Sequence, residues 1–269
     1  MKNYIIYLSF ILTTLIACDK IEQDEFLLDG GGVEIDTTTF VKKVLIEDFT
    51  GHTCQNCPQA ADEIHTLQQI SAYQGKIVAI GIHAGFFAET NTNFPTDFRT
   101  PEGTEVHDYF GVASYPKGMV SRRGFNTTTH LLDFPGWGEA VADLINLEPE
   151  IGIKMSVENG AVKIEAKLLQ EVNDELKLVV VLTEDKIIDN QLDEVLGMIT
   201  DYEHNHVLRT SLNGTWGQTV ALNISSFETY SFDYSLDPSW NESNVNAVAY
   251  IYSETSKEVL QAEEIHLIP

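Results

Sequence analysis

Positive charge is scarce in this chain of 269 residues. It has 16 Lys and Arg residues against 41 Asp and Glu residues, which gives a formal net charge of −25 at pH 7. A field of this sign repels the phosphate backbone of nucleic acids and anionic lipid headgroups, so we expect no nucleic-acid partner. Hydrophobic residues still make up 43% of the chain, which is enough to bury the cores of two modest domains.

Long apolar runs are also lacking. The stretch from Tyr4 to Ile16 follows Lys2 and is interrupted only by serine and threonine residues. It is too short to span a bilayer comfortably, and it has the length of the apolar region of a signal peptide. We therefore interpret residues 1–17 as an export signal.

The end of this segment, from Leu15 to Cys18, resembles the lipobox of bacterial lipoproteins. A leucine stands three positions before the cysteine, the small residue Ala17 precedes it, and Cys18 would carry the lipid. The resemblance implies lipidation at Cys18 and attachment to a membrane, because two or more acyl chains anchor a protein stably. Residues 18–40 are acidic and contain three consecutive glycines, so we expect them to form a tether.

Cysteine is nearly absent from the rest of the chain, where only Cys54 and Cys57 remain. A Cys-x-x-Cys pair can form a redox dithiol, supply half of a zinc site or arise by coincidence. A zinc site would need two further ligands, and His52 and His65 are the nearest histidines. We expect neither a metal nor a cofactor.

The residues around the pair follow the order strand, turn, helix. Residues 44–49 form an apolar run typical of a buried strand, and residues 50–53 form a turn. Apolar residues at steps of three and four predict a helix from Cys57 onward. Such a helix directs its N-terminal dipole at Cys54 and stabilises a thiolate there. We therefore expect Cys54 to be the exposed nucleophile and Cys57 to be the buried resolving thiol.

A second apolar run, residues 76–83, predicts a parallel strand reached by a right-handed crossover. Residues 110–122 then resemble the thioredoxin segment in which a cis-proline, here Pro116, opens a strand beside the active-site disulfide. Asp48 stands where thioredoxins carry a buried acid that accepts a proton from the second cysteine. The resemblance also implies a closing helix within residues 133–147.

The chain departs from the thioredoxin pattern at several positions. Thioredoxins usually carry a tryptophan before the first cysteine, where this chain has Thr53, and Gly-Pro between the cysteines, where it has Gln55 and Asn56. Residues 84–108 are polar and rich in turn-forming residues, as expected of an insertion. These departures concern substrate range and redox potential more than the fold.

The apolar pattern changes from residue 151 to the alternation of β-strands, with a hairpin turn at Asn159 and Gly160. Further alternating runs occupy residues 176–182, 219–224, 229–234, 245–252 and 260–267. The sequence thus predicts an α/β thioredoxin-like domain over residues 41–149, followed by an all-β immunoglobulin-like sandwich over residues 150–269. We identify no catalytic grouping in this second part.

Two histidines stand out in the second part. If residues 201–206 formed a strand, His204 and His206 would point the same way, as a metal-binding pair does. The alternative is a polar edge that packs against a neighbouring loop.

Nearly the whole chain after the signal peptide is similar to the twenty-eight-kilodalton outer-membrane protein family of bacterial lipoproteins. The similarity rests on residues 47–51, 54–58, 115–116, 202–209 and 214–217. It implies a lipid-anchored protein of the outer membrane, on its periplasmic or surface face, and it assigns no substrate.

Three functional hypotheses follow. In the first, the chain is a thiol–disulfide oxidoreductase of the envelope with Cys54, Cys57, Asp48 and Pro116 as its catalytic residues, acting on thiols or disulfides of envelope proteins. In the second, it is a non-enzymatic binding or structural lipoprotein with a permanent Cys54–Cys57 bridge. The third, a metal-sequestering surface protein, would use the acidic excess and the histidine pair.

Overall fold

The computed structural model describes residues 39–125 and 129–268. The expected signal peptide (1–17), the lipidation site Cys18 and almost all of the expected tether (18–40) lie outside these residues. Among the described residues, no helix is both long enough and apolar enough to cross a membrane.

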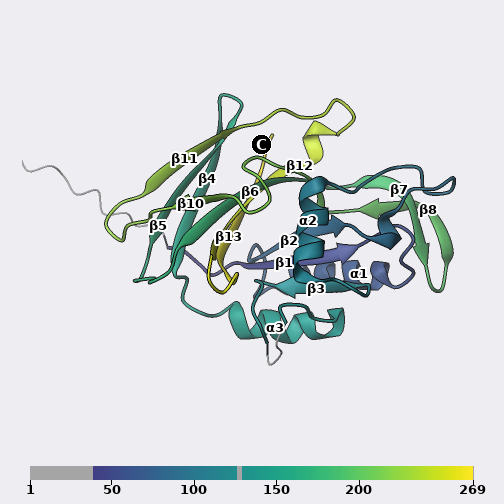
Figure 1. Ribbon diagram of the computed structural model, residues 1–269, viewed down its shortest axis with the longest axis horizontal. Coiled ribbons are helices and arrows are strands. Elements are labelled where there is room, and N and C mark those ends of the chain that lie inside the picture. The colour runs from purple at the N-terminus through teal and green to yellow at the C-terminus, as the bar shows by residue number, and fades with distance from the viewer. Residues whose placement is uncertain (1–38, 126–128, 269) are drawn as a thin grey trace, which may run out of the picture. The chain divides into compact units, whose positions relative to one another are not determined.

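The first described elements are strand β1 (Val44–Thr50), helix α1 (Cys57–Gln69) and strand β2 (Ile77–His83), in the order that the sequence predicts (Figure 1). β1 and β2 pair in parallel, and α1 forms the crossover between them. β3 (Lys117–Val120) pairs with β1 in the antiparallel sense. Continuous apolar runs form these strands because both of their faces are buried.

One helix lies where the sequence indicates only an insertion. Helix α2 (Pro101–Phe110) begins after Thr100, whose side chain accepts a hydrogen bond from the Gly103 N–H, and it ends at Gly111 in the left-handed conformation. These are ordinary helix-capping signals, but the segment carries few buried apolar residues. The expected closing helix is present as α3 (Trp137–Leu144), after a short 3₁₀ turn.

Seven strands of the second part overlap the runs that the alternating pattern predicts. They are β4 (Ile151–Glu158), β5 (Ala161–Leu168), β6 (Leu176–Glu184), β10 (Gln218–Val220), β11 (Glu228–Asp233), β12 (Val245–Ser253) and β13 (Val259–His266). Of these, β10 covers only the first two residues of the predicted run 219–224. Both Asn159 and Gly160 have positive φ, as the predicted two-residue hairpin turn requires. The strands β7 (Ile187–Asp193), β8 (Gly197–His204) and β9 (Val207–Ser211) are additional to that prediction.

The strands form three sheets. The largest has eight strands in the order β13-β12-β6-β9-β2-β1-β3, with β10 beside β6; a three-stranded sheet has the order β11-β5-β4; and β7 pairs with β8 alone. β9 connects the early and late strands of the largest sheet, where the Gly81 N–H donates to the His206 carbonyl at 2.7 Å. The described chain is therefore mostly β-sheet with a few helices.

This topology differs from the expected succession of two domains. Strands from residues 41–149 and from residues 150–269 share one sheet, and Phe40–Pro269 form a single compact unit. The expected boundary at residue 149 thus lies between segments that belong to a common sheet. Alternation locates a strand in the sequence but carries no information on its distant neighbours. Independent folding of residues 150–269 stays a prediction.

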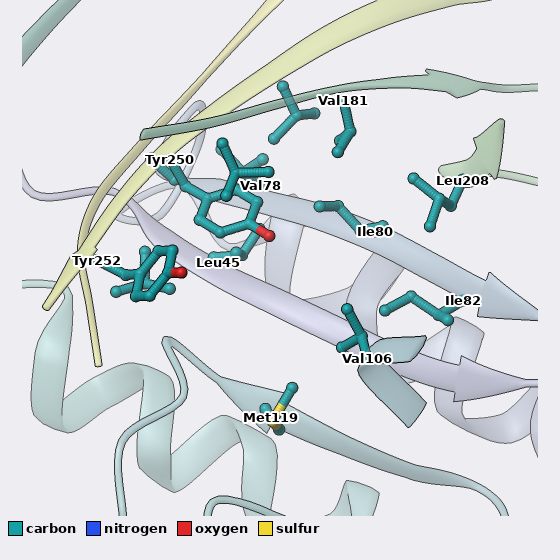
Figure 2. Close-up of a cluster of buried hydrophobic side chains, with 14 of the residues drawn as sticks. Leu45, Val78, Ile80, Ile82, Val106, Met119, Val181, Leu208, Tyr250 and Tyr252 are labelled. Atoms are coloured by element: carbon teal, nitrogen blue, oxygen red, sulfur yellow. The ribbon is translucent and has the colours of Figure 1, made fainter. Parts of the chain in front are cut away.

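The large sheet takes part in three apolar cores. Side chains of the early and late strands meet in the first, the shared core (Figure 2), which includes Leu45, Val78, Ile80, Val181, Leu208, Tyr250 and Tyr252. The sandwich core lies between β4, β5 and β11 and the alternate residues of β6 and β12. The third core packs α1 and α3 against β1 and β2. β6 and β12 are buried on both faces because they contribute to two cores.

Candidate functional site

Cys54 and Cys57 form a disulfide at the start of α1, with their Cα atoms 5.4 Å apart. The turn before the helix is held by the Cys54 N–H, which donates to the Gly51 carbonyl at 3.0 Å. The Cys57 N–H donates in turn to the Cys54 carbonyl at 3.3 Å. The predicted arrangement of strand, turn, cysteine pair and helix is thus present.

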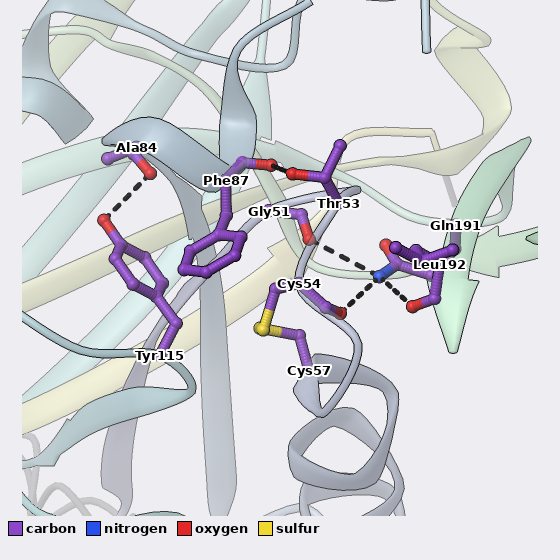
Figure 3. The surroundings of a disulfide bond; sticks show 9 residues. All are labelled: Gly51, Thr53, Cys54, Cys57, Ala84, Phe87, Tyr115, Gln191 and Leu192. Carbon is purple, nitrogen blue, oxygen red and sulfur yellow. Dashed lines mark hydrogen bonds between the residues drawn. A yellow bond between two sulfur atoms is a disulfide. The ribbon is translucent and has the colours of Figure 1, made fainter. Parts of the chain in front are cut away.

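The disulfide is less accessible than the sequence suggests. We expected Cys54 to be exposed, but Cys54 and Cys57 each have an exposed fraction of 2%. The covering segment includes Phe87, whose carbonyl accepts hydrogen bonds from the Thr53 N–H and hydroxyl (Figure 3). This approach needs a glycine at position 51, because a Cβ there would lie 2.4 Å from the Phe87 carbonyl carbon. The polar segment read as an insertion therefore covers the disulfide.

The Tyr115–Pro116 peptide bond is cis, and it directly precedes β3. The Tyr115 hydroxyl donates to the Ala84 carbonyl at 2.9 Å, and its ring lies 5.3 Å from the Phe87 ring in an edge-on contact (Figure 3). Pro116 thus follows a cis peptide bond and directly precedes a strand, as the thioredoxin resemblance implies, and its neighbour Tyr115 packs against Phe87.

A distant hairpin, formed by β7 and β8, supports the cysteine turn from the other side. The Gln191 side-chain amide contacts the carbonyls of Gly51 and Cys54 at 3.4 and 3.1 Å (Figure 3). The Leu192 N–H donates to the His52 carbonyl at 2.8 Å. Sequence reasoning missed this support, because nothing near residues 187–204 indicates a contact about 140 positions away.

Asp48 lies on β1 with an exposed fraction of 4%, and its Oδ1 atom has no hydrogen-bond partner among the described residues. Burial raises the pKa of this carboxyl to about 7. Asp48 and Cys57 both line a cavity of about 40 Å³, together with His83 and His204. The predicted acid and the second cysteine are therefore brought to one place, with two histidines that the sequence did not connect to them.

His83 and His204 are almost fully buried, and their ring centroids lie 5.7 Å apart. The Phe98 ring packs against both, at 5.0 and 5.1 Å between centroids. Burial, together with His204, His52 and Arg209, lowers the pKa of His83 well below its ordinary value. Burial also lowers the pKa of His204 to about 4. Both imidazoles are therefore neutral at neutral pH.

The sequence allows two metal sites: a pair formed by His204 and His206, and a zinc site in which His52 and His65 would join the cysteines. His204 ends β8 and lines the cavity, whereas His206 has a positive φ beyond the strand and pairs with Asp185 at 3.2 Å. His52 is buried against Phe94, and His65 is exposed on α1. Over residues 39–125 and 129–268, no group of three or more His, Cys, Asp or Glu side chains is arranged to hold a metal ion.

Comparisons with known proteins give one family and a common fold. The family model of outer membrane protein Omp28 matches residues 104–267, a range that contains the hairpin and His204 but not the cysteine pair. HBP35 of Porphyromonas gingivalis is similar in structure, with a TM-score of 0.65 and 13% identity over 85% of this chain and 76% of that one. A search of curated proteins found no match.

Two further solved structures resemble the chain. A protein from Agrobacterium tumefaciens has a TM-score of 0.56 and 14% identity over 86% of this chain and 96% of that one. A domain of the outer membrane lipoprotein Omp28 from Porphyromonas gingivalis is 22% identical over 44% of this chain and 88% of that one, with a TM-score of 0.33. At these identities, the likeness to the first protein and to HBP35 concerns the fold alone.

Proposed function

Because the chain belongs to the Omp28 family of outer membrane proteins, it is a protein of the cell envelope, and we propose that it exchanges thiols and disulfides there through Cys54 and Cys57. One observation carries the proposal. The disulfide lies at the N-terminal end of helix α1, and Cys57 lines the same cavity as Asp48, a buried carboxyl group with an unpaired oxygen. A redox dithiol needs both a stabilised thiolate and a nearby proton acceptor.

We propose a role in this exchange for each of four residues, namely Cys54, Cys57, Asp48 and Pro116. After reduction, Cys54 faces the N-terminal dipole of α1, which favours its thiolate and makes it the attacking sulfur. Cys57 resolves the mixed disulfide, and Asp48 accepts its proton. Pro116 positions the Tyr115 backbone where a partner polypeptide would pass the sulfurs.

The architecture that we propose for this activity is thioredoxin-like. Its support is the order β1, cysteine pair, α1, β2, followed by a cis-proline before β3. We propose in addition that β4, β5 and β11 form one layer of an immunoglobulin-like sandwich, whose other layer is β6 and β12. The cysteine pair then lies on the thioredoxin-like part, and the sandwich braces it through their common sheet.

We also propose that Cys18 carries the lipid that holds the protein at the outer membrane, with the folded part on the periplasmic or the surface face. The lipobox-like residues before Cys18 and the family both support this. Labelling with a radioactive fatty acid is expected to mark the wild-type protein but not Cys18→Ser. Unlabelled wild-type protein in the soluble fraction would exclude the anchor.

Burial of the disulfide favours a second candidate function, a structural or binding lipoprotein with a permanent bridge. Cys54 and Cys57 each have an exposed fraction of 2%, so their sulfurs react only if surrounding segments, such as that of Phe87, move aside. Oxidoreductase activity therefore requires this cover to open, whereas a permanent bridge does not.

Trapping of mixed disulfides with partner proteins distinguishes the oxidoreductase from the protein with a permanent bridge. In Cys57→Ser cells, Cys54 attacks partners but cannot be released by its neighbour, so covalent complexes with envelope proteins are expected to accumulate. Cys54→Ser is the matched control, because it keeps one cysteine of the pair and removes the nucleophile. If neither variant yields complexes that disappear on reduction, the permanent bridge is the better account.

A further inference from the structure

Asp48 lies between two cavities that differ in access. The outer pocket, between α1 and β8, has a volume of about 240 Å³, and its lining includes the exposed residues Asp62, His65 and Glu203. The inner cavity, of about 40 Å³, is lined by Cys57, His83 and His204 among others. Asp48 and Tyr202 line both cavities. Asp48 therefore borders both the pocket that reaches the surface and the cavity that Cys57 lines.

The inner cavity has an unusual concentration of unpaired polar atoms. Among the described residues, both ring nitrogens of His83, Nε2 of His204 and Oδ1 of Asp48 have no hydrogen-bond partner. The exposed fraction of each of these three residues is 4%. Buried polar groups are normally paired, since leaving one unpaired costs stability. Four such atoms beside a redox-capable sulfur indicate a functional role for this cavity.

The charged and titratable groups around the two imidazoles keep them neutral. Asp48 and Tyr202 share their cavity, and His52, Asp189 and Arg209 act on them electrostatically. Burial lowers the pKa of both histidines and outweighs the opposing effect of Asp189 on His204. A neutral imidazole has one N–H donor and one acceptor nitrogen. Both nitrogens of His83 have no partner among the described residues, so His83 can accept a proton on one side and release one on the other, whereas His204 also interacts with the Asn190 backbone and has Nε2 available.

We propose that His83 and His204 form a proton relay between Asp48 and the sulfur of Cys57, which operates whenever the disulfide opens or closes. This inference rests on the proposed exchange function and extends it to two residues that the fold brings together from β2 and β8.

The relay fits a balanced reaction with a partner dithiol as the reductant. One partner thiolate attacks Cys54, the bond between the Cys54 and Cys57 sulfurs breaks, and Cys57 leaves as a thiolate with the electron pair. An imidazole N–H protonates this thiolate, while the relay takes up a replacement proton from Asp48 and the outer pocket. The second partner thiol then loses its proton and attacks the first partner sulfur, and the bond between that sulfur and Cys54 breaks. Cys54 leaves with the electron pair and takes up this proton, so the partner becomes a disulfide and this protein a dithiol.

Rates measured in both directions test the relay. The full mature protein is reduced by dithiothreitol and reoxidised by the cyclic disulfide of dithiothreitol at pH 7. In His83→Gln and His204→Gln, both rate constants are expected to fall by about tenfold or more, because general acid–base catalysis contributes at least that much. Their ratio, the equilibrium constant, should not change, since a relay speeds both directions alike. His266→Gln is the control, as His266 bonds to the Ser243 carbonyl and lines neither cavity.

A changed equilibrium constant with an unchanged rate in one direction would overturn the relay, since it indicates a purely electrostatic role. If the glutamine variants do not fold, wild-type protein in heavy water gives a second measurement. The relay predicts that both rates fall about twofold or more there, and equal rates in the two solvents would overturn it. A wild-type disulfide that no dithiol reduces would instead contradict the exchange function itself.

Discussion

Glu47 and Asp48 follow one another on β1 and are both almost fully buried, yet their surroundings are opposite. Glu47 faces the shared core and accepts two hydrogen bonds from Arg122, at 2.7 and 2.6 Å. Arg122 also donates to the Tyr250 hydroxyl at 2.9 Å, which joins the early strands to β12. Asp48 faces α1, and one of its oxygens has no partner among the described residues.

The contrast separates a structural charge from a chemical one. A buried ion pair with good geometry is self-sufficient, and removing one partner leaves an uncompensated charge. A buried carboxyl without a partner has a raised pKa and can exchange a proton near neutral pH. The same strand therefore carries a paired carboxylate on one face and a carboxyl group with an unpaired oxygen on the other.

Breaking the ion pair between Glu47 and Arg122 should have the largest effect on the free energy of unfolding. Arg122→Met leaves the Glu47 carboxylate buried without its partner, so we expect a loss of about 3–5 kcal/mol in the free energy of unfolding. Arg123→Met is the matched control: its contact with Glu258, at 3.8 Å, is at the surface and is expected to contribute less than about 1 kcal/mol. Urea denaturation measures both, and equal losses would contradict the structural role of Arg122.

Removing the Asp48 charge should change how stability depends on pH. The pKa is about 7 in the folded protein against an ordinary value of 3.8, so between these values the folded state binds a proton that the unfolded state lacks. The free energy of unfolding contributed by Asp48 therefore falls as the pH rises through this window. Asp48→Asn removes that loss.

From pH 4 to pH 8, we expect the stability difference to move by up to about 4 kcal/mol in favour of Asp48→Asn over wild type. His204, whose pKa is lowered to about 4, acts in the opposite direction below pH 6.5, but it does so in both proteins and cancels in the difference. Asp62→Asn, at an exposed carboxylate of α1, is the control. If the difference in the free energy of unfolding between Asp48→Asn and wild type does not vary with pH, the pKa of Asp48 is not raised in the folded protein.

The hairpin support of the cysteine turn should have an intermediate effect. Gln191→Ala removes the side-chain donor to the carbonyls of Gly51 and Cys54, which keep their backbone donors, at an expected cost of about 0.5–1.5 kcal/mol for each hydrogen bond lost. Gln69→Ala, at an exposed position of α1, should be neutral by comparison. Thermal unfolding of the two variants gives the comparison, and equal midpoints would contradict the role of Gln191.

The smallest expected effect concerns the cover of the disulfide. Phe87→Ala thins that cover, so reduction by dithiothreitol should become faster by about tenfold, which corresponds to about 1.4 kcal/mol in the barrier. Phe86→Ala removes a neighbouring ring that is 74% exposed, and it should leave the rate unchanged. If both variants react at the wild-type rate, another segment limits access to Cys54.

Local patterns explain why part of the site could be predicted. The run before the cysteine pair, the helical spacing after it and the proline at position 116 are each contained in a short stretch of sequence. Asp48 could be placed because the resemblance to thioredoxins fixes its distance from Cys54.

Contacts between distant segments account for what the sequence did not show. His83 and His204 meet only because β8 returns beside α1 and β2, and neither residue has a local signal of that contact. The cover by Phe87 and the Gln191 contact arise in the same way, as does the sharing of one sheet between the two predicted domains. Nothing local to Cys54 indicates its burial.

The reduction potential of the Cys54–Cys57 pair tests the central claim most directly. The purified mature protein is equilibrated with glutathione and dithiothreitol buffers at pH 7, and its free thiols are counted by alkylation and mass spectrometry. A pair that exchanges with envelope partners is expected to have a midpoint between about −120 and −270 mV, the range of known dithiol exchange proteins. A midpoint below about −300 mV would contradict the account, because ordinary reductants would then leave the bridge closed.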